Sequence, residues 1–344
     1  RAITGRIRDG RVLLSDLTMT DEDVRRLGRI LIIACGSSYH VGMVGKYTLE
    51  RLLRRPVEVC LASEFRYSDP LVSQGDLVIV ISQSGETLDT MAALREAKKR
   101  GARVLSIVNV VGSSIARESD DVLYTWAGPE IAVATTKAYT TQMVVLHLLG
   151  LYFGDVLGTV DLETYTAMVR GIEALPGQME AILSDTDDIR SAAKALAGHE
   201  HIFFIGRNLD YALSLEGSLK LKEISYIHSE AYASGELKHG TISLIQPGTP
   251  VIAVATYMPL FDKALSNVVE VQARGASVLA LTTEDGGEEL RRHVDTVLTV
   301  PRAETMLLPQ LGVLPLQLLA YYAALERGCD IDKPRNLAKS VTVE

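Results

Sequence analysis

The sequence has few cysteines. Cys35, Cys60 and Cys329 are the three among 344 residues, and they lie far apart in no CxxC pair. This excludes a disulfide framework and a cysteine zinc site, so we expect a cytoplasmic protein with no bound metal and no cofactor. No signal peptide is visible, although the sequence begins at Arg1, so the chain is a piece of a longer one or lacks its start.

The sequence also lacks a basic excess and a long apolar run. It has 35 basic and 43 acidic residues, and its longest basic runs are residues 54–55 and 98–100. Nucleic-acid binding is therefore not expected. The longest apolar run, residues 143–153, is interrupted by His147 and Gly150 and is too short to cross a bilayer, so we expect no membrane segment.

Three nucleotide and metal motifs are missing. The sequence contains no GxGxxG, no GxxxxGK[ST] and no HExxH. Dehydrogenase, nucleotide kinase and zinc protease activities thus lose their main support.

The most informative stretch is residues 76–99. Residues 77–81 are all apolar, which predicts a strand buried on both faces, and Met91, Leu94 and Ala97 have helical spacing. Between them lies a polar turn that contains Ser82, Gln83, Ser84, Gly85, Glu86 and Thr87. A strand, a hydroxyl-rich turn and a helix N-terminus together predict an anion site.

A simpler interpretation of this turn is helix capping. Ser84 or Thr87 alone would suffice as an N-cap, which accounts for one hydroxyl and the glycine. The turn supplies three hydroxyls and an amide but no Lys or Arg, so an anion there would be held by dipoles rather than by a charge pair.

An internal duplication organises the chain. Four apolar segments recur in the same order at a nearly constant offset, beginning with LIIACG from Leu31 and HIFFIG from His201. Each copy alternates strands with amphipathic helices, which predicts an α/β fold with a parallel sheet flanked by helices, in a flavodoxin-like three-layer arrangement. We expect an entry segment at 1–28, the first domain at 29–158, a helical connector at 159–199 broken at Pro176, the second domain at 200–330 and a tail at 331–344.

Ligands of such sheets lie at the carboxyl ends of the strands. There the first copy places Ser37 and Ser38 after one strand, residues 82–87 after another, and residues 133–137 (VATTK) after a third. The second copy carries few hydroxyls at these positions, so we expect only the first copy to bind a phosphate.

The second copy concentrates charge in residues 215–240. On a helix, Glu216, Lys220, Glu223 and Ile227 would share one face. The simpler interpretation is a surface ion pair worth about 0.2–0.5 kcal/mol. His239, close to this stretch, adds an imidazole, and acid, base and amine together suit proton transfer on a carbonyl compound. We expect His228 to be a core-facing or structural histidine.

Five separated motifs resemble one family. They are ACGSSYH, ISQSGET, GPEIAVATTKAYTTQ, LEGSLKLKEISYIH with GELKHG, and the terminal PRNLAKSVTVE. Over essentially the whole length these are similar to the sugar-isomerase half of the glutamine:fructose-6-phosphate aminotransferases, the glucosamine-6-phosphate synthases. That resemblance implies two tandem sugar-isomerase (SIS) domains.

The resemblance also implies residue roles. Glu223 would carry a proton between C1 and C2 with Lys220 nearby, His239 of the neighbouring subunit would assist ring opening, and Lys339 would form an imine with the open-chain ketose. Without the resemblance, Lys339 would be expected to be a solvated surface lysine. The implied phosphate and sugar contacts are Ser38, Ser82, Gln83, Ser84, Thr87, Val133, Thr135 and Ala338.

The activity implied is conversion of fructose 6-phosphate and ammonia to glucosamine 6-phosphate in a homodimer with a shared active site. The glutaminase half of the family uses an N-terminal cysteine that no residue here replaces, so we expect this chain alone not to use glutamine. Two alternatives remain open: a non-catalytic sugar-phosphate-binding regulator, and a fructosamine-phosphate deglycase of the same fold.

Overall fold

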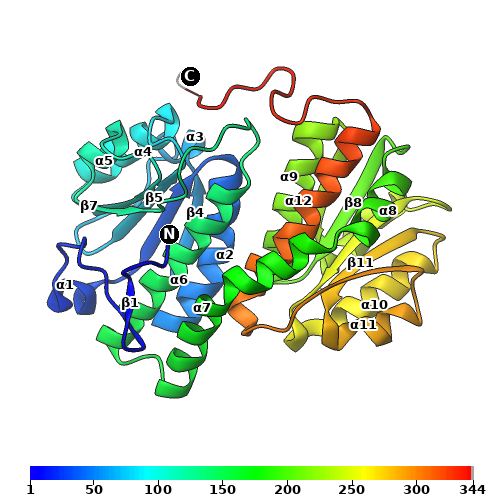
Figure 1. Cartoon of the computed structure of the whole chain (residues 1–344). Coiled ribbons are helices and arrows are strands. Elements are labelled where there is room, and N and C mark those ends of the chain that lie inside the picture. Colours follow the sequence, from blue (N-terminus) through cyan, green and yellow to red (C-terminus); the bar gives the residue numbers. More distant parts are fainter. Residues whose placement is uncertain (342–344) are drawn as a thin grey trace. The chain divides into compact units, whose positions relative to one another are not determined.

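The chain forms two compact units (Figure 1), described for residues 1–341 in a computed structural model. Unit 1 comprises Arg1–Ile131, Thr135–Glu173 and the described residues from Ala338 onward, and unit 2 comprises Ala132–Ala134 and Ala174–Leu337. Residues 342–344, which end the expected tail, lie outside the described part.

Unit 1 is built on a parallel sheet with the strand order β4-β3-β5-β6-β7. Strands β3 and β5 are buried along their whole length and pair from Ile30 opposite Leu77 to Ala34 opposite Ile81. Continuous apolar sequence is what a strand covered on both faces requires. The strands are β3 (Ile30–Ala34), β4 (Val57–Leu61), β5 (Leu77–Ser82), β6 (Arg103–Val108) and β7 (Asp121–Tyr124).

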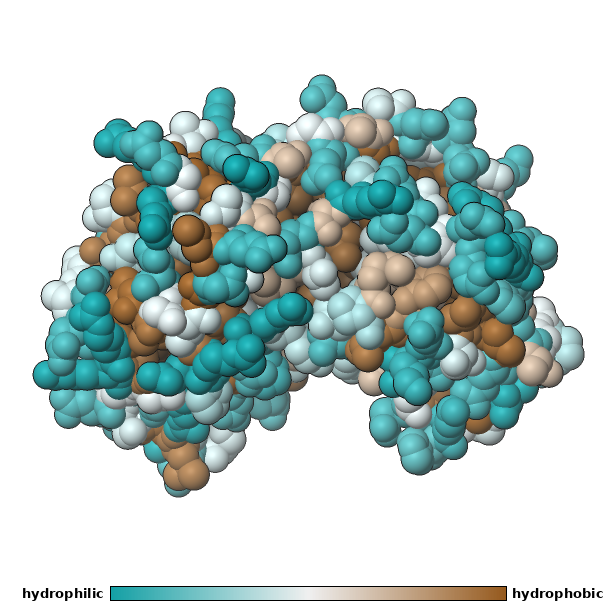
Figure 2. Space-filling model, turned by 90° about the horizontal axis from the view of Figure 1, so that it is seen from below, coloured by the Kyte–Doolittle hydropathy of each residue, from teal (hydrophilic) through white to brown (hydrophobic). Residues whose placement is uncertain are grey.

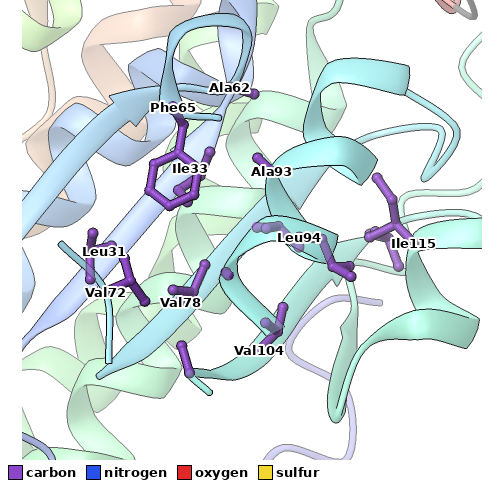
Figure 3. Close-up of a cluster of buried hydrophobic side chains, with 14 of the residues drawn as sticks. Leu31, Ile33, Ala62, Phe65, Val72, Val78, Ala93, Leu94, Val104 and Ile115 are labelled. Carbon is purple, nitrogen blue, oxygen red and sulfur yellow. The ribbon is translucent and has the colours of Figure 1, made fainter. Parts of the chain in front are cut away.

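Helices cover both faces of this sheet. Leu31 and Ile33 of β3 belong to a buried cluster with Phe65, Leu94 and Ile115 (Figure 3). Alternate residues of a strand face opposite sides, and Ile32 accordingly meets the helix on the other face, α2. The helices are α2 (Gly36–Leu53), α3 (Ala62–Phe65), α4 (Leu88–Lys99), α5 (Ser114–Glu118) and α6 (Lys137–Leu157).

The entry segment has structure of its own. Strands β1 (Ile7–Arg8) and β2 (Arg11–Val12) form a hairpin, and Asp9 and Gly10 at its tip both have positive φ, as a tight two-residue turn requires. Helix α1 (Asp21–Arg26) begins with a capping box in which Thr20 and Asp23 bond each other's backbone.

Unit 2 repeats the topology, with the strand order β12-β11-β10-β8-β9. The two parallel sheets flanked by helices confirm the predicted α/β class. The strands are β8 (His201–Gly206), β9 (His228–Ala233), β10 (Pro250–Ala255), β11 (Ser277–Thr283) and β12 (Thr296–Val300). The α-helices are α8 (Asp187–Leu196), α9 (Leu209–Ser225), α10 (Phe261–Gln272), α11 (Glu284–Arg291) and α12 (Leu308–Glu326). The 3₁₀ turns are η1 (Ser234–His239), η2 (Thr241–Leu244), η3 (Met258–Leu260) and η4 (Thr305–Leu307).

One expectation about elements is wrong, and two strands were not predicted. Helix α7 (Leu162–Ser184) runs through Pro176 without a break, because buried Ile172 and Leu175 before the proline and Ile182 after it hold the apolar stripe in place. Each sheet also has a fifth strand that the four recurring segments did not include. These strands, β4 and β9, lie at sheet edges and carry polar residues, so they lack the continuous apolar signal of the inner strands.

Two helices are apolar and long enough to cross a membrane, Lys137–Leu157 and Thr305–Glu326. Their most apolar windows are 67% and 72% buried inside the protein, which is typical of core helices. The face drawn in Figure 2 intersperses hydrophilic residues with hydrophobic ones, as the surface of a globular protein does.

Candidate active site

The strand order of unit 1 places a crevice between β3 and β5. The chain leaves these neighbouring strands toward opposite sides of the sheet, so the helices that follow them, α2 and α4, diverge at the carboxyl edge. In such sheets this is the position where ligands bind. Ser37 and Ser38 lie there in the first turn of α2, and residues 82–87 form the turn that leads into α4.

The turn after β5 is held by its own hydroxyls. The Ser82 Oγ accepts from the Gly85 amide at 3.0 Å and lies 3.0 Å from the Thr87 Oγ1. The Ser84 Oγ accepts from the Glu86 amide at 3.2 Å. Thr87 is the N-cap of α4 by position, but its side chain makes no capping hydrogen bond. The capping interpretation is therefore wrong for Thr87, and Ser84 bonds within the turn.

Gly85 is required by this turn. Its φ of +70° is a conformation that only glycine adopts at little cost, and an added Cβ would lie 2.0 Å from the Ser113 Oγ. The tight approach of the turn to Ser113 fixes the direction in which its amides point.

Glu86 places a carboxylate in the turn for which an anion site is predicted, but this carboxylate points elsewhere. Glu86 accepts from the Ser114 amide at 2.8 Å, so its charge is directed at the start of α5. This hydrogen bond holds the pKa of Glu86 below its usual value.

Ser38 is held by a residue that sequence reasoning did not single out. Its Oγ donates to the Gln142 Oε1 at 3.2 Å, and the Gln142 side chain, which comes from α6, is completely buried. A buried amide partner restricts the Ser38 hydroxyl to one orientation.

The tail lies against the same turn. The Ser340 Oγ is 3.1 Å from the Ser84 Oγ, and the Val341 carbonyl accepts from the Leu88 amide at 3.3 Å. The neighbouring Lys339 extends its Nζ to within 3.0 Å of the Glu130 Oε2. Lys339 and the turn of residues 82–87, which we call the phosphate turn after its predicted ligand, thus belong to one compact unit, although more than 250 residues separate them in sequence.

The ionisable residues of the second copy form a buried trio on α9. The Lys220 Nζ lies 3.5 Å from the Glu216 Oε1 and donates to the Glu223 Oε2. Burial alone would lower the pKa of Lys220, but the two carboxylates outweigh burial and raise it. Glu216 is fully buried whereas the Glu223 side chain is 21% exposed, so Glu223 is the more accessible of the two carboxylates.

Three expectations for this region need comment. Ile227 does not share the helix face, because α9 ends at Ser225 and Tyr226 follows in the left-handed conformation. His228 is not core-facing, since it is exposed at the start of β9, with its Nδ1 3.2 Å from that of His201. His239 ends η1 and is exposed.

The predicted site residues divide between the two units. Val133 is in unit 2, where its amide donates to the Asp332 carbonyl at 2.9 Å. Unit 1 holds Ser38, Ser82, Gln83, Ser84, Thr87, Thr135, Ala338 and Lys339, and unit 2 holds Val133, Lys220, Glu223 and His239. Sequence reasoning missed Glu130, Gln142 and Ser340; the first two lie inside the quoted GPEIAVATTKAYTTQ motif, whose spacing alone assigns them no role.

The equivalent crevice of unit 2, between β8 and β10, is already occupied by a side chain. Asp210 in the first turn of α9 is buried; it accepts from the Thr256 hydroxyl and, at 2.9 Å, from the Tyr257 amide. Burial raises the pKa of Asp210 to about 6 despite these hydrogen bonds. A carboxylate of the protein itself thus takes the donors of this crevice.

The similar proteins of known name include glutamine–fructose-6-phosphate aminotransferases. The chain is 56% identical over 344 residues to the glutamine–fructose-6-phosphate aminotransferase [isomerizing] of Symbiobacterium thermophilum, covering 99% of this chain and 56% of the relative. The chain thus spans about half the length of the curated relatives it matches.

Two solved structures have a similar fold over most of the chain. The C-terminal domain of glucosamine-fructose-6-phosphate aminotransferase from Francisella tularensis superposes with a TM-score of 0.92 at 38% identity, covering 96% of this chain and 94% of that one. A glucosamine-6-phosphate deaminase from Thermotoga maritima gives a TM-score of 0.74 at 26% identity, with 91% and 90% coverage.

The family itself is identified by two matched stretches. The SIS domain family matches residues 24–152 and 195–327, which contain the two parallel sheets. The tandem arrangement expected from the duplication is thereby confirmed. The chain belongs to the SIS domain family and is similar over nearly its whole length to the isomerase domain of glutamine–fructose-6-phosphate aminotransferases.

Proposed function

We propose that this chain is the sugar-phosphate isomerase module of a glucosamine-6-phosphate synthase. It binds fructose 6-phosphate and, with ammonia that a separate glutaminase domain releases from glutamine, yields glucosamine 6-phosphate in the cytoplasm. A relative of about twice this length carries the name of the whole reaction, which is consistent with one module being present here.

The position of the tail carries the proposal. Lys339 would be expected to be a solvated lysine, yet its neighbour Ser340 bonds Ser84 of the phosphate turn. A phosphate held by the turn would therefore anchor a sugar next to the segment that carries a primary amine. An anchored carbonyl and a positioned amine are the two requirements for imine formation at practical rates.

We assign to the ionisable residues the roles that the family resemblance implies. The Lys339 nitrogen adds to the C2 carbonyl and water leaves, which gives a protonated imine. Ammonia then adds to C2 and the Lys339 amine leaves, so that the substrate carries an imine of ammonia whose C1 proton is acidic. Glu223 removes the proton from C1 and delivers it to C2, and Lys220 holds this carboxylate in place. Glu216 is too deeply buried to take part directly.

Reductive trapping tests the proposal. Borohydride added with fructose 6-phosphate should reduce the imine to a stable secondary amine, which peptide mass mapping would locate at Lys339. An adduct at Lys220 would contradict the assignment of the amine. Binding without an adduct at any lysine would favour the non-catalytic regulator, and turnover of a fructosamine phosphate in place of fructose 6-phosphate would favour the deglycase.

We further propose a homodimer whose active site receives His239 from the neighbouring subunit. Mixing two inactive variants, His239→Ala and Glu223→Gln, tests this. If half of the dimers are mixed and each has one intact site, roughly a quarter of the wild-type isomerase activity should return. No recovery after confirmed subunit exchange would place His239 in the same site as its own Glu223.

A further inference from the structure

Glu130 connects two segments of unit 1, and the sequence analysis assigned it no role. It lies between β7 and α6, and its side chain is 4% exposed. One carboxylate oxygen, Oε1, accepts from the Thr136 amide at 2.9 Å and from the Ala138 amide at 3.3 Å. The other, Oε2, lies 3.0 Å from the Lys339 Nζ.

These contacts give the carboxylate two distinct tasks. Helix α6 begins at Lys137, and its N-cap residue Thr136 makes no side-chain capping bond, so Glu130 supplies the acceptor for the amides at this helix end. Because two backbone amides hold Oε1, the position of Oε2 is fixed as well. A fixed carboxylate oxygen restricts the ammonium group of a flexible lysine to a small volume.

We propose that Glu130 is a positioning residue for the imine-forming amine, and this inference rests on the proposed function. Glu130 holds the Lys339 nitrogen, and Ser340 and Val341 hold the backbone that follows against residues 82–88. Without the carboxylate, the lysine side chain would sample many rotamers and rarely face the substrate carbonyl.

The charge balance of the step supports this role. The ammonium group of Lys339 and the C2 carbonyl yield a protonated imine and water: the carbon–nitrogen bond forms, the carbon–oxygen bond breaks, and the oxygen leaves with two protons from the nitrogen. The nitrogen bears a positive charge before and after the step. Glu130 therefore pairs with a cation in both states, without having to move.

The Glu130→Gln variant separates the two tasks. Glutamine retains an oxygen for the Thr136 and Ala138 amides but removes the charge that holds Lys339. Glu118→Gln is the matched control, because Glu118 forms an exposed ion pair with Arg95 in the same unit. Two quantities are measured: the rate at which borohydride traps fructose 6-phosphate on Lys339, and the affinity for a hexitol 6-phosphate, which has no carbonyl.

In Glu130→Gln we expect the trapping rate to fall roughly 10- to 100-fold, the penalty typical of a misplaced reacting group. Its hexitol-phosphate affinity should match the wild type, and Glu118→Gln should match the wild type in both measurements. Glu130→Asp, which keeps the charge but shortens the side chain, should trap more slowly than the wild type and serves if the glutamine variant does not fold.

Three results would overturn the inference. If Glu130→Gln, or Glu130→Asp in its place, traps at the rate of Glu118→Gln, the positioning role is wrong while the proposed function stands. If the trapping rate and the hexitol-phosphate affinity fall by the same factor, Glu130 only stabilises the start of α6. If the wild type gives no adduct at Lys339, the proposed function fails and this inference fails with it.

Discussion

The two units share one topology but differ at the point where the strand order reverses. Both have a crevice where the strand order reverses, between β3 and β5 in unit 1 and between β8 and β10 in unit 2. The crevice of unit 1 is bordered by hydroxyls and amides from residues 82–87 and from Ser38. The crevice of unit 2 is filled by Asp210, which is bonded to Thr256 and Tyr257.

This difference shows that the two copies of a duplicated fold can place different groups at equivalent positions. A set of oriented donors favours an anion, and unit 2 supplies one from its own sequence, whereas we propose that a ligand supplies it in unit 1. Strand order alone therefore does not identify a binding site. The ionisable residues of unit 2 lie further along α9, in the trio of Glu216, Lys220 and Glu223.

The largest expected effect concerns the chemistry of unit 2. Glu223→Gln should lower the exchange of the C1 and C2 protons of fructose 6-phosphate with solvent by about 10²- to 10⁴-fold, the usual contribution of general acid–base catalysis. Phosphate affinity should persist, because the donors lie in unit 1. Exchange followed by NMR in deuterated water is the measurement, and exchange at the wild-type rate would remove Glu223 from this role.

The buried carboxylate of unit 2 should appear in the pH dependence of stability. Since the pKa of Asp210 is raised to about 6 in the folded state, its proton stabilises the fold at low pH, and this stabilisation is lost as the pH rises through 6. Relative to Asp210→Asn, the wild type should lose about 3 kcal/mol of unfolding free energy between about pH 4 and 7.

Asp121 of unit 1 provides the control with the opposite sign. Burial alone would raise its pKa, but hydrogen bonds from Arg103 and Thr18 outweigh burial and lower it, so its stabilisation is lost as the pH falls. By urea unfolding, the stability difference between the wild type and Asp210→Asn should fall as the pH rises from about 4 to 7, whereas the difference for Asp121→Asn should rise with pH below about pH 4, where its carboxyl titrates. Parallel slopes would contradict the assignment.

A glycine substitution tests the rigidity of the turn in unit 1. Gly85→Ala places a Cβ against Ser113 and should weaken phosphate binding by tenfold or more, since the left-handed conformation alone costs about 1–2 kcal/mol. Gly248→Ala in unit 2 has similar φ and open space around the Cβ. It should lose stability only. Equal phosphate affinity of the two variants, measured by calorimetry, would show that the turn adapts.

The smallest effects come from a pair of isosteric changes. Thr256→Val removes a partner of the buried Asp210 and should lower the unfolding free energy by about 1–3 kcal/mol without changing phosphate affinity. Thr87→Val should act mainly on binding: stability should fall by only about 0.5–1.5 kcal/mol, because Thr87 makes no capping bond and loses one hydrogen bond to Ser82, while affinity falls about tenfold. The same outcome for both variants would remove the distinction between the crevices.

Much of the fold was predictable from local signals. The apolar runs of β3 and β5, the hairpin at Asp9 and Gly10 and the capping box at Thr20 all have short-range causes. The edge strands β4 and β9 were missed because half-exposed strands mix polar and apolar residues. The helix through Pro176 was missed because tertiary burial on both sides of the proline outweighs its local effect.

The site was predictable only where its residues are adjacent in sequence. Residues 82–87 are informative because strand, turn and helix are adjacent in sequence. The pairing of Lys339 with Glu130, and of Ser340 with Ser84, joins segments more than 200 residues apart. No spacing rule reaches that far, so the resemblance alone pointed to Lys339, and Glu130 emerged only from the structure.

The most direct test of the central claim is a crystal structure of the protein with fructose 6-phosphate. The account predicts the phosphate within hydrogen-bond distance of Ser82, Ser84 and Thr87, held without a lysine or arginine from the turn. A phosphate bound instead at the crevice of unit 2, beside Tyr257, would contradict it.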